Sequence, residues 1–230
     1  VAGRSGFRPL PAISHGPNTG PGMYDALFFD LDGTLIDTES IAAATGLAAF
    51  AAHGHHVDLA FMHSLIGKDE PTAAGIIRTA LPDADLDAVS RAWRDGFEAG
   101  VNLGLPLKPG AAELLAGPSL PRILVTSSGR DGAHRKLGIA GIADAFAHVV
   151  TLNDVTSAKP APDPYLLAAR LLGVPPARCL VFEDSETGAE SAHRAGCVVV
   201  QVPDIAPSKG RWAHHLAPDL LTGARMAGLI

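Results

Sequence analysis

The carboxyl-terminal part of this 230-residue chain alternates between short apolar runs and helical patterns. Strands that are joined by helices of this length predict crossover units and a parallel sheet. The expected fold class is therefore α/β, a doubly wound parallel sheet with helices on both faces. The predicted strands here are Arg122 to Thr126, His148 to Thr151, Cys179 to Phe182 and Cys197 to Val202, and the predicted helices between them are Asp131 to Leu137, Pro164 to Leu172 and Thr187 to Ala195.

A long insertion follows the first predicted strand, Ala26 to Phe29. Between Asp37 and Leu105 the chain has helical patterns and no convincing strand, and an insertion of that length predicts a helical subdomain rather than a loop. Its two ends should act as hinges beside the carboxyl end of the first strand, where open α/β sheets bind ligands. The predicted helices are Ser40 to Ala52, Pro71 to Leu81 and Leu86 to Asn102, and the predicted hinges are Ile36 to Thr38 and Leu105 to Pro109.

The amino-terminal segment, residues 1–22, contains four Pro and five Gly without apolar periodicity. This composition predicts a disordered extension, and the segment lacks the apolar core of a secretory signal. The expected domains are then an α/β core formed by residues 23–37 and 106–230, and a helical domain formed by residues 38–105.

The overall composition excludes several classes of partner. Hydrophobic residues make up 47% of the chain and charged residues 18%, as in globular proteins. The formal charge, 18 minus 24, is −6, which offers no basic surface for nucleic acid or an anionic membrane. Cys179 and Cys197 each open an apolar run and are read as buried thiols. We expect a cytoplasmic protein, a monomer or weak homodimer, with neither nucleic acid nor membrane as a partner.

The first strand runs into the motif DLDGTL, which has two carboxylates two residues apart, Asp30 and Asp32. Strand alternation would point both to the same side, and like charges that close resist ionising together unless a cation lies between them. The motif therefore indicates a divalent metal and phosphoryl transfer. Gly33 frees the backbone to turn its N–H groups towards an anion, and the Thr34 hydroxyl can donate to a phosphate oxygen. The alternative is an ordinary acidic turn after a strand.

Two further strand ends have residues suited to phosphate. Thr126, Ser127 and Ser128 offer hydroxyl and backbone N–H groups that can hold phosphate oxygens, although Ser and Thr also commonly serve as helix N-caps. Lys159 lies in the proline-rich segment SAKPAPDPY, where a rigidly held cation would offset the carboxylates and a transferring phosphoryl group. Its alternative is a solvated surface lysine.

The fourth strand end has Glu183 and Asp184 directly after an apolar run. Two buried acids without a partner cost several kcal/mol, and a hard cation removes that cost. Mg²⁺ prefers a few carboxylates together with waters and phosphate oxygens, which suits Asp30 and Asp184, with Glu183 as a further candidate.

Taken in chain order, the motifs DxDGT, Thr126, Lys159 and Glu183-Asp184 resemble those of the haloacid dehalogenase-like hydrolase superfamily, over Tyr24 to about Val202. The resemblance implies a Rossmann-like core, and the helical insertion looks like the helical cap of that family. Three short segments are similar to β-phosphoglucomutase-like and sugar-phosphate phosphatase members. These segments are DTE at Asp37 to Glu39, KPxPDxY at Lys159 to Tyr165 and EDS at Glu183 to Ser185.

The resemblance also implies a role for each matching residue. Asp30 would be the nucleophile that becomes an aspartyl phosphate, and Asp32 the general acid and base, with a pKa raised by burial beside other acids. Thr126 and the backbone of Ser127 would hold phosphate oxygens, while Lys159 would neutralise Asp30 and the phosphate. The implied Mg²⁺ ligands are Asp30, the Asp32 carbonyl and Asp184, with Glu183 nearby.

The departures from the family pattern bear on the reaction. Dehalogenases of the family lack an acid at the position of Asp32, so a carbon–halogen reaction is not expected. Mutase members have a His where this chain has Ala42, and an Arg three residues after a glycine resembling Gly67, where this chain has Glu70. The expected activity is therefore a Mg²⁺-dependent phosphatase for a small phosphorylated metabolite, such as a sugar phosphate or a phosphoglycolate-like molecule.

Two alternatives and two weaker residue assignments complete the sequence-based expectations. The alternatives are a β-phosphoglucomutase-type phosphomutase and a catalytically idle, phosphate-binding interaction module. Gly67, Ser128 and Arg130 are weak candidates for substrate binding, since Arg130 is equally well explained as a solvated residue in the first turn of a helix. Trp93 and Phe97, four residues apart, are expected to pack within the helical insertion rather than form a stacking platform.

Overall fold

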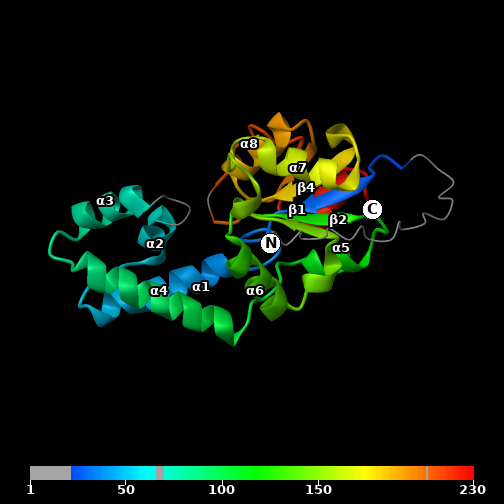
Figure 1. The fold of residues 1–230 in the computed structure, drawn as a ribbon. Coiled ribbons are helices and arrows are strands. Elements are labelled where there is room, and N and C mark those ends of the chain that lie inside the picture. The colour runs from blue at the N-terminus through cyan, green and yellow to red at the C-terminus, as the bar shows by residue number, and fades with distance from the viewer. Residues whose placement is uncertain (1–21, 66–69, 206) are drawn as a thin grey trace, which may run out of the picture.

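The computed structural model describes residues 22–65, 70–205 and 207–230 (Figure 1). Nearly all of the predicted disordered extension, residues 1–21, and the predicted substrate residue Gly67 lie outside the described residues.

The described residues form a six-stranded sheet in which every neighbouring pair is parallel. The strand order is β3-β2-β1-β4-β5-β6, so β1 lies between β2 and β4 in the middle of the sheet. The predicted α/β class is therefore confirmed. The strands are β1 Ala26–Phe29, β2 Arg122–Val125, β3 His148–Val150, β4 Cys179–Glu183, β5 Val198–Gln201 and β6 His215–Leu216. Strand β6 was not predicted, because two residues are too few to form an apolar run.

Helices cover both faces of this sheet, which explains why the strands read as uninterrupted apolar runs. In β1, Ala26 and Phe28 join the cluster under α7 and α8, whereas Leu27 and Phe29 join the cluster under α5, α6 and α9. Figure 1 shows α7 and α8 above the sheet and α5 and α6 below it. These helices are α5 Ala111–Ala116, α6 Arg130–Ala140, α7 Asp163–Leu172, α8 Glu186–Arg194 and α9 Leu220–Met226, and short 3₁₀ turns lie at Ala143–Ala145, Leu152–Asp154 and Pro176–Arg178.

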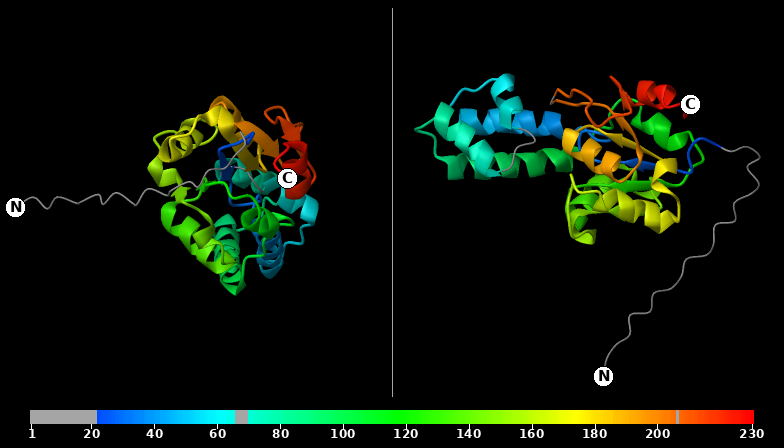
Figure 2. Two further views of the ribbon diagram at one scale, coloured as in Figure 1. Left: turned by 90° about the vertical axis from the view of Figure 1, so that its right-hand side faces the viewer. Right: turned by 90° about the horizontal axis from the view of Figure 1, so that it is seen from above.

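The inserted helices lie to one side of the sheet and give the molecule an elongated shape (Figure 2). They enclose a separate apolar cluster around Phe50, whose ring lies 5.6 Å from that of Phe61 and 6.4 Å from that of Trp93. Trp93 packs against this cluster as predicted, whereas Phe97, predicted to pack in the same way, packs against the larger cluster that includes residues of β1. The helices are α1 Thr38–Ala52, α2 Leu59–Leu65, α3 Glu70–Ala80 and α4 Leu86–Leu103, of which α2 was not predicted.

The two connections between the inserted helices and the sheet run side by side. Ile36 pairs with Leu107 in an antiparallel bridge, and the Asp37 N–H donates to the Pro106 carbonyl over 3.0 Å. A second contact crosses from the core to the inserted helices near this point, where Arg135 of α6 donates to Glu98 of α4 over 2.6 Å. The predicted hinge segments are thus neighbours in space.

Local signals account for several element ends. Asp37 caps α1 by accepting from the Ser40 N–H over 3.0 Å, and Ser185 caps α8 by accepting from the Gly188 N–H over 3.0 Å.

Cys179 and Cys197 are free and buried, as predicted. Among the described residues, no helix combines the length and apolarity that a membrane crossing requires.

Candidate active site

The candidate site lies where the strand order reverses, at the carboxyl ends of β1 and β4. Asp30 directly follows β1, Glu183 is the last residue of β4, and Asp184 comes next. The Asp30 N–H donates to the Phe182 carbonyl over 3.0 Å, which ties the two strand ends together. In open parallel sheets, the crevice at such a reversal is the usual ligand site. Side chains that are far apart in the sequence therefore meet here.

Lys159 connects the acids of this site. Its Nζ lies 2.7 Å from Asp30 Oδ1, 2.6 Å from Glu183 Oε1 and 2.9 Å from the Val125 carbonyl oxygen. Only 4% of the Lys159 side chain is exposed, so the alternative of a solvated surface lysine is wrong. A buried ammonium with three oxygen acceptors has its full hydrogen-bonding capacity satisfied. The geometry holds this charge beside the predicted nucleophile.

The charges of the site do not balance within the protein. Asp30, Glu183 and Asp184 have carboxylate oxygens within 4.8 Å of one another, whereas Lys159 is the cation bonded to two of them. Burial raises the pKa of Asp30 to about 7, although the Lys159 charge opposes this rise. Burial and the charges of Asp30 and Glu183 raise the pKa of Asp184 well above its usual range. With all three carboxylates ionised, the single ammonium leaves two negative charges, which match one divalent cation.

The Asp184 carboxylate lies close against the backbone of the loop that follows β1. Gly33 has a φ of +82°, and a Cβ at this position would lie only 2.5 Å from Asp184 Oδ2. Glycine is therefore required both by the turn and by the close approach of this carboxylate. The Thr34 hydroxyl lies 3.5 Å from Asp184 Oδ1, on the same side of the loop. Asp30 and Asp184, with their hard oxygen donors, fit Mg²⁺.

Glu183 has a more enclosed environment than the other two acids. Its Oε1 accepts from Lys159 and from the Tyr165 hydroxyl, each over 2.6 Å, and its Oε2 lies 3.3 Å from Ser185 Oγ. Burial and the charge of Glu183 raise the pKa of Tyr165, so the phenol remains a donor. A Cβ on Gly188 would lie 2.0 Å from this carboxyl group, so the start of α8 encloses it. The protein thus satisfies Glu183 largely without a metal.

Asp32 lies in a different environment from the one expected. Its Oδ1 accepts from Lys136 over 2.7 Å and its Oδ2 accepts from Ser128 over 2.9 Å. The side chain is 27% exposed, so the expectation that Asp32 is buried beside other acids is wrong. The reason is that α6 follows the second motif and brings Lys136 back over the loop. Ser128, a weak candidate from the sequence, contacts both Asp32 and Lys136.

The second motif is not a helix cap. Thr126 is buried, and its Oγ1 accepts from the Ser128 N–H over 3.0 Å. Helix α6 has Gly129 at its N-cap, without a side-chain capping bond, so the capping alternative for Thr126 is wrong. Ser127 is exposed at the end of β2. Arg130 forms an ion pair with Asp154 at the surface, which agrees with its reading as a solvated residue in the first turn.

A second acidic group lies between the core and α1. Glu39 Oε2 and Asp204 Oδ2 are buried and have no hydrogen-bond partner within residues 22–65, 70–205 and 207–230. Burial, followed by the charges of Asp204, Asp32 and Asp37, raises the pKa of Glu39 to about 7, against the opposing charge of Lys108. Lys108 instead donates to Asp204 Oδ1 over 2.6 Å. Glu39 therefore has an acceptor oxygen available for a ligand.

A cavity of about 290 Å³ lies beside Asp32, Lys136 and Glu39. Asp32, Glu39 and Lys136 form its polar side, and Ala42, Trp93 and Phe97 of α1 and α4 form its apolar side. The cavity therefore lies between the carboxyl ends of the strands and the inserted helices. Sequence reasoning did not single out Lys136, Glu39, Asp204 or Lys108 as site residues. Of these four, only Glu39 falls within a segment that resembles the family, DTE. Tyr165, which bonds to Glu183, likewise falls within the KPxPDxY segment.

Comparison with known proteins identifies the family. The model of the haloacid dehalogenase-like hydrolase family matches residues 24–196. Hexitol phosphatase A of Escherichia coli (strain K12) is 35% identical over 179 residues, covering 76% of this chain and 81% of that protein. Fructose-1-phosphate phosphatase YqaB of the same organism is 30% identical over 184 residues, covering 78% and 96%.

Solved structures agree with this assignment. A HAD family hydrolase from Deinococcus radiodurans R1, determined with bound phosphate and sodium, is 28% identical and has a TM-score of 0.71, covering 90% of this chain and 88% of that one. The family match extends over most of the chain and includes all four motifs at the strand ends. The chain therefore belongs to the haloacid dehalogenase-like hydrolases, as its motifs predicted.

Proposed function

We propose that the chain is a Mg²⁺-dependent phosphatase that hydrolyses a small phosphomonoester, such as a sugar phosphate, through an aspartyl-phosphate intermediate. The observation that carries the proposal is the contact of 2.7 Å between Lys159 Nζ and Asp30 Oδ1 at the strand-order reversal. This contact gives a buried carboxylate and a fixed cation at a single ligand crevice. The names of the relatives, a hexitol phosphatase and a fructose-1-phosphate phosphatase, support the same class of substrate.

The first step uses Asp30 as the nucleophile. One of its carboxylate oxygens attacks phosphorus, the bond to the ester oxygen breaks, and an aspartyl phosphate forms. Lys159 neutralises charge on the transferring group, while Thr126, the backbone of Ser127 and the loop at Gly33 and Thr34 hold its oxygens. Because the ammonium is already held in place, no reorganisation is needed when the charge develops.

Asp32 serves both steps as acid and base. It protonates the leaving alcohol oxygen, then takes a proton from the water that attacks the aspartyl phosphate, which releases phosphate and restores Asp30. Lys136 and Ser128 hold the two Asp32 oxygens, which orients the carboxyl group towards the cavity. Lys136 is therefore proposed as a positioning residue for the acid and base.

We propose that Mg²⁺ is held by Asp30, Asp184 and the backbone carbonyl of Asp32. When bound, it would neutralise the two excess negative charges and the charge on the phosphate. The close grouping of the carboxylates and the raised pKa of Asp184 support this ligand set. Glu183 is proposed to act through Lys159, since Lys159 and Tyr165 already occupy its Oε1.

The inserted helices are proposed to be a cap domain, residues 38–105, over a core of residues 23–37 and 106–230. The paired connections at Ile36 and Leu107 would let the cap open for substrate and close to exclude water. The cavity between Asp32 and the α1–α4 pair would hold the body of the substrate. The free, buried cysteines support a cytoplasmic location for this enzyme.

The mutase remains the second enzymatic candidate, and one observation ranks it lower. Ala42 lines the cavity beside Asp32, so this wall has a methyl group where mutase members have an imidazole. Without groups that hold a bisphosphate for a second transfer, water should take the aspartyl phosphate. The idle binding module is also disfavoured, because each motif residue of the hydrolase is present at its strand end.

Two assays test the proposal. Turnover of p-nitrophenyl phosphate with Mg²⁺, and its loss with a chelator, separates an enzyme from a binding module. A rate equal to that of buffer alone with Mg²⁺ present would refute the enzyme. β-Glucose 1-phosphate with a bisphosphate activator then separates the two reactions, because a phosphatase gives no accumulation of glucose 6-phosphate. Formation of glucose 6-phosphate faster than phosphate release would favour the mutase.

A further inference from the structure

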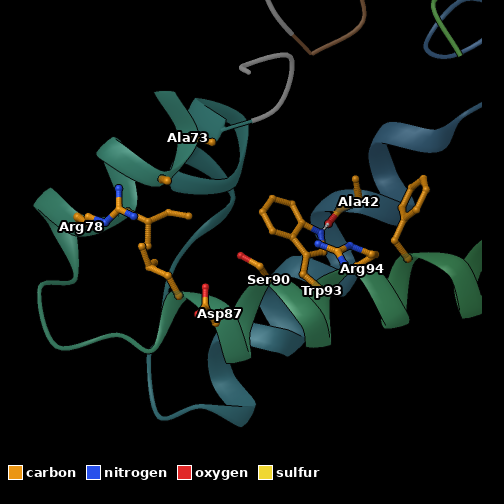
Figure 3. Close-up of a pocket in the computed structure, with 11 residues that line it drawn as sticks. Ala42, Ala73, Arg78, Asp87, Ser90, Trp93 and Arg94 are labelled. Carbon is orange, nitrogen blue, oxygen red and sulfur yellow. Dashed lines mark hydrogen bonds between the residues drawn. The ribbon is translucent and has the colours of Figure 1, made fainter. Parts of the chain in front are cut away.

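A second cavity, of about 410 Å³, lies among the inserted helices (Figure 3). We call it the cap groove. Helix α4 forms one wall through Leu86, Ser90, Trp93 and Phe97, which are spaced by four, three and four residues and so share one face of the helix. Leu86 and Phe97 are eleven positions apart on the helix, which corresponds to about 16 Å along its axis. The groove is therefore elongated along α4.

Small side chains keep this groove open. Ala73 and Ala74 of α3 and Ala42 of α1 also line it, and their short side chains leave space beside the large side chains of α4. The Trp93 indole is fixed, because its Nε1 donates to the Ala42 carbonyl over 2.8 Å. Trp93 thus packs on Phe50 and also presents ring surface to the groove. A ring held in this way gives a flat apolar surface for a ligand ring.

The cap groove adjoins the active-site cavity. The two cavities share Ala42, Trp93 and Phe97 in their walls. A molecule whose phosphate lies at Asp30 would extend past Asp32 and Glu39 and then reach Trp93. The end of the groove near Phe97 therefore meets the body of a bound substrate, and the rest of the groove lies further from the reacting phosphorus.

The charges along the groove favour an anion. Arg78 of α3 and Arg94 of α4 line it, and neither forms an ion pair with any residue that the structure describes. Figure 3 shows Arg94 beside Trp93 and Arg78 at the opposite end. The carboxylate of Asp87 also lines the groove, but it lies in the first turn of α4, where the helix N-terminus stabilises it. The two guanidinium groups are left for a ligand.

We propose that the cap groove is a substrate-binding subsite for the far end of an elongated phosphomonoester, whose leaving group carries a ring to lie on Trp93 and an anionic substituent on that ring to pair with Arg94. This inference rests on the proposed phosphatase function and specifies its substrate class. A triose-sized ester would leave the groove empty. The joined cavities, the fixed indole and the two free arginines together favour a substrate with two linked parts.

A matched series of probes tests the proposal. Ribose 5-phosphate has no ring beyond the sugar, uridine 5′-monophosphate adds a planar ring, and orotidine 5′-monophosphate adds a carboxylate to that ring. We expect kcat/KM to rise about tenfold when the ring is added, as stacking on an aromatic side chain implies. We expect a further rise of about fivefold when the carboxylate is added, from a charge-assisted contact with Arg94.

Two variants with matched controls locate the effect. Arg94→Gln should remove the preference for the carboxylate, whereas Arg91→Gln, on the same helix but outside the groove lining, should keep it. Ala74→Phe should fill the groove and lower the ratio of kcat/KM for uridine 5′-monophosphate to that for ribose 5-phosphate. Ala80→Phe, at an exposed position on the same helix and outside the lining, should keep that ratio.

The proposal is overturned if the three probes have kcat/KM values within about twofold of one another, or if Arg94→Gln keeps the wild-type preference for the carboxylate. Failure of the phosphatase function gives a different result, since p-nitrophenyl phosphate would not be hydrolysed either. A binding measurement then tests the subsite without relying on turnover. In the Trp212→Phe background, orotidine 5′-monophosphate should quench Trp93 fluorescence saturably, and Arg94→Gln should weaken this binding. No saturable quenching would overturn the subsite.

Discussion

Lys136 Nζ lies 2.7 Å from Asp32 Oδ1, although 104 residues separate the two along the chain. The same ammonium lies 3.2 Å from Ser128 Oγ, which itself donates to the other Asp32 oxygen. The proposed acid and base is thus held by a triangle of contacts from α6 and the loop before it. This arrangement links the orientation of Asp32 to a helix of the core rather than to the cap.

Lys136→Met should lower kcat for p-nitrophenyl phosphate by about tenfold or more, because Asp32 loses the contact that orients it. The affinity for Mg²⁺ should be kept, since Lys136 contacts none of the three clustered acids. Lys209→Met is the matched control, because Lys209 is exposed. Wild-type kcat in Lys136→Met would remove the positioning role.

Asp30→Asn should reduce turnover by about 10³-fold or more, because an amide of nearly the same shape is a poor nucleophile. The fold should be retained, as Lys159 keeps its contacts with Glu183 and the Val125 carbonyl. Steady-state kinetics and the far-UV circular dichroism of purified protein check both expectations. Asp131→Asn, at an exposed position in α6, controls for the loss of a carboxylate, and substantial activity in Asp30→Asn would exclude it as the nucleophile.

Asp184→Ala should raise the Mg²⁺ concentration needed for half-maximal rate by about tenfold, because a proposed ligand is lost. Glu183→Gln should instead lower kcat with a smaller change in that Mg²⁺ concentration, since Glu183 is bonded to Lys159 and Tyr165. Titrations of rate against Mg²⁺ compare the two variants, with Asp144→Ala as a surface control. An unchanged titration for Asp184→Ala would remove it from the ligand set.

Tyr165→Phe should lower the free energy of unfolding by about 2 kcal/mol, because a buried carboxylate loses a hydrogen-bond donor. Tyr24→Phe provides the comparison. The Tyr24 hydroxyl donates to the neutral Ala227 carbonyl over 2.8 Å, so its removal should cost only about 1 kcal/mol. Urea denaturation measures both values. Equal losses would mean that the charge of Glu183 adds nothing to the contact with Tyr165.

Glu39→Gln should stabilise the protein at about pH 8 and leave its stability unchanged near pH 4.5. The folded state raises the pKa of Glu39 to about 7 from 4.5, so ionisation favours the unfolded state as the pH rises between these values. Because Glu39 is partly exposed, we expect a gain of about 1 kcal/mol at the higher pH. Urea denaturation in the presence of a chelator measures the difference, and a gain of equal size at both pH values would contradict this explanation.

Local sequence patterns predicted most of the core. Uninterrupted apolar runs marked β1 to β5 because both faces of the sheet are covered, and the turn and capping residues around Gly33 and Ser185 marked where elements begin or end. Elements without a strong local pattern, such as α2, α5, α9 and β6, were missed. These elements are short, and packing on neighbours rather than intrinsic propensity stabilises them.

The sequence by itself determined which chemistry the strand ends could support, because Asp30, Thr126, Lys159 and Asp184 each follow a recognisable local signal. Only the tertiary structure decided which of these residues meet. Strand order brings β1 beside β4, and the length of the Lys159 side chain lets one ammonium reach both Asp30 and Glu183. The partners of Asp32 and the opposing walls of the cap groove depend on how separate helices pack together, because local spacing gives the face of one helix but not its neighbours.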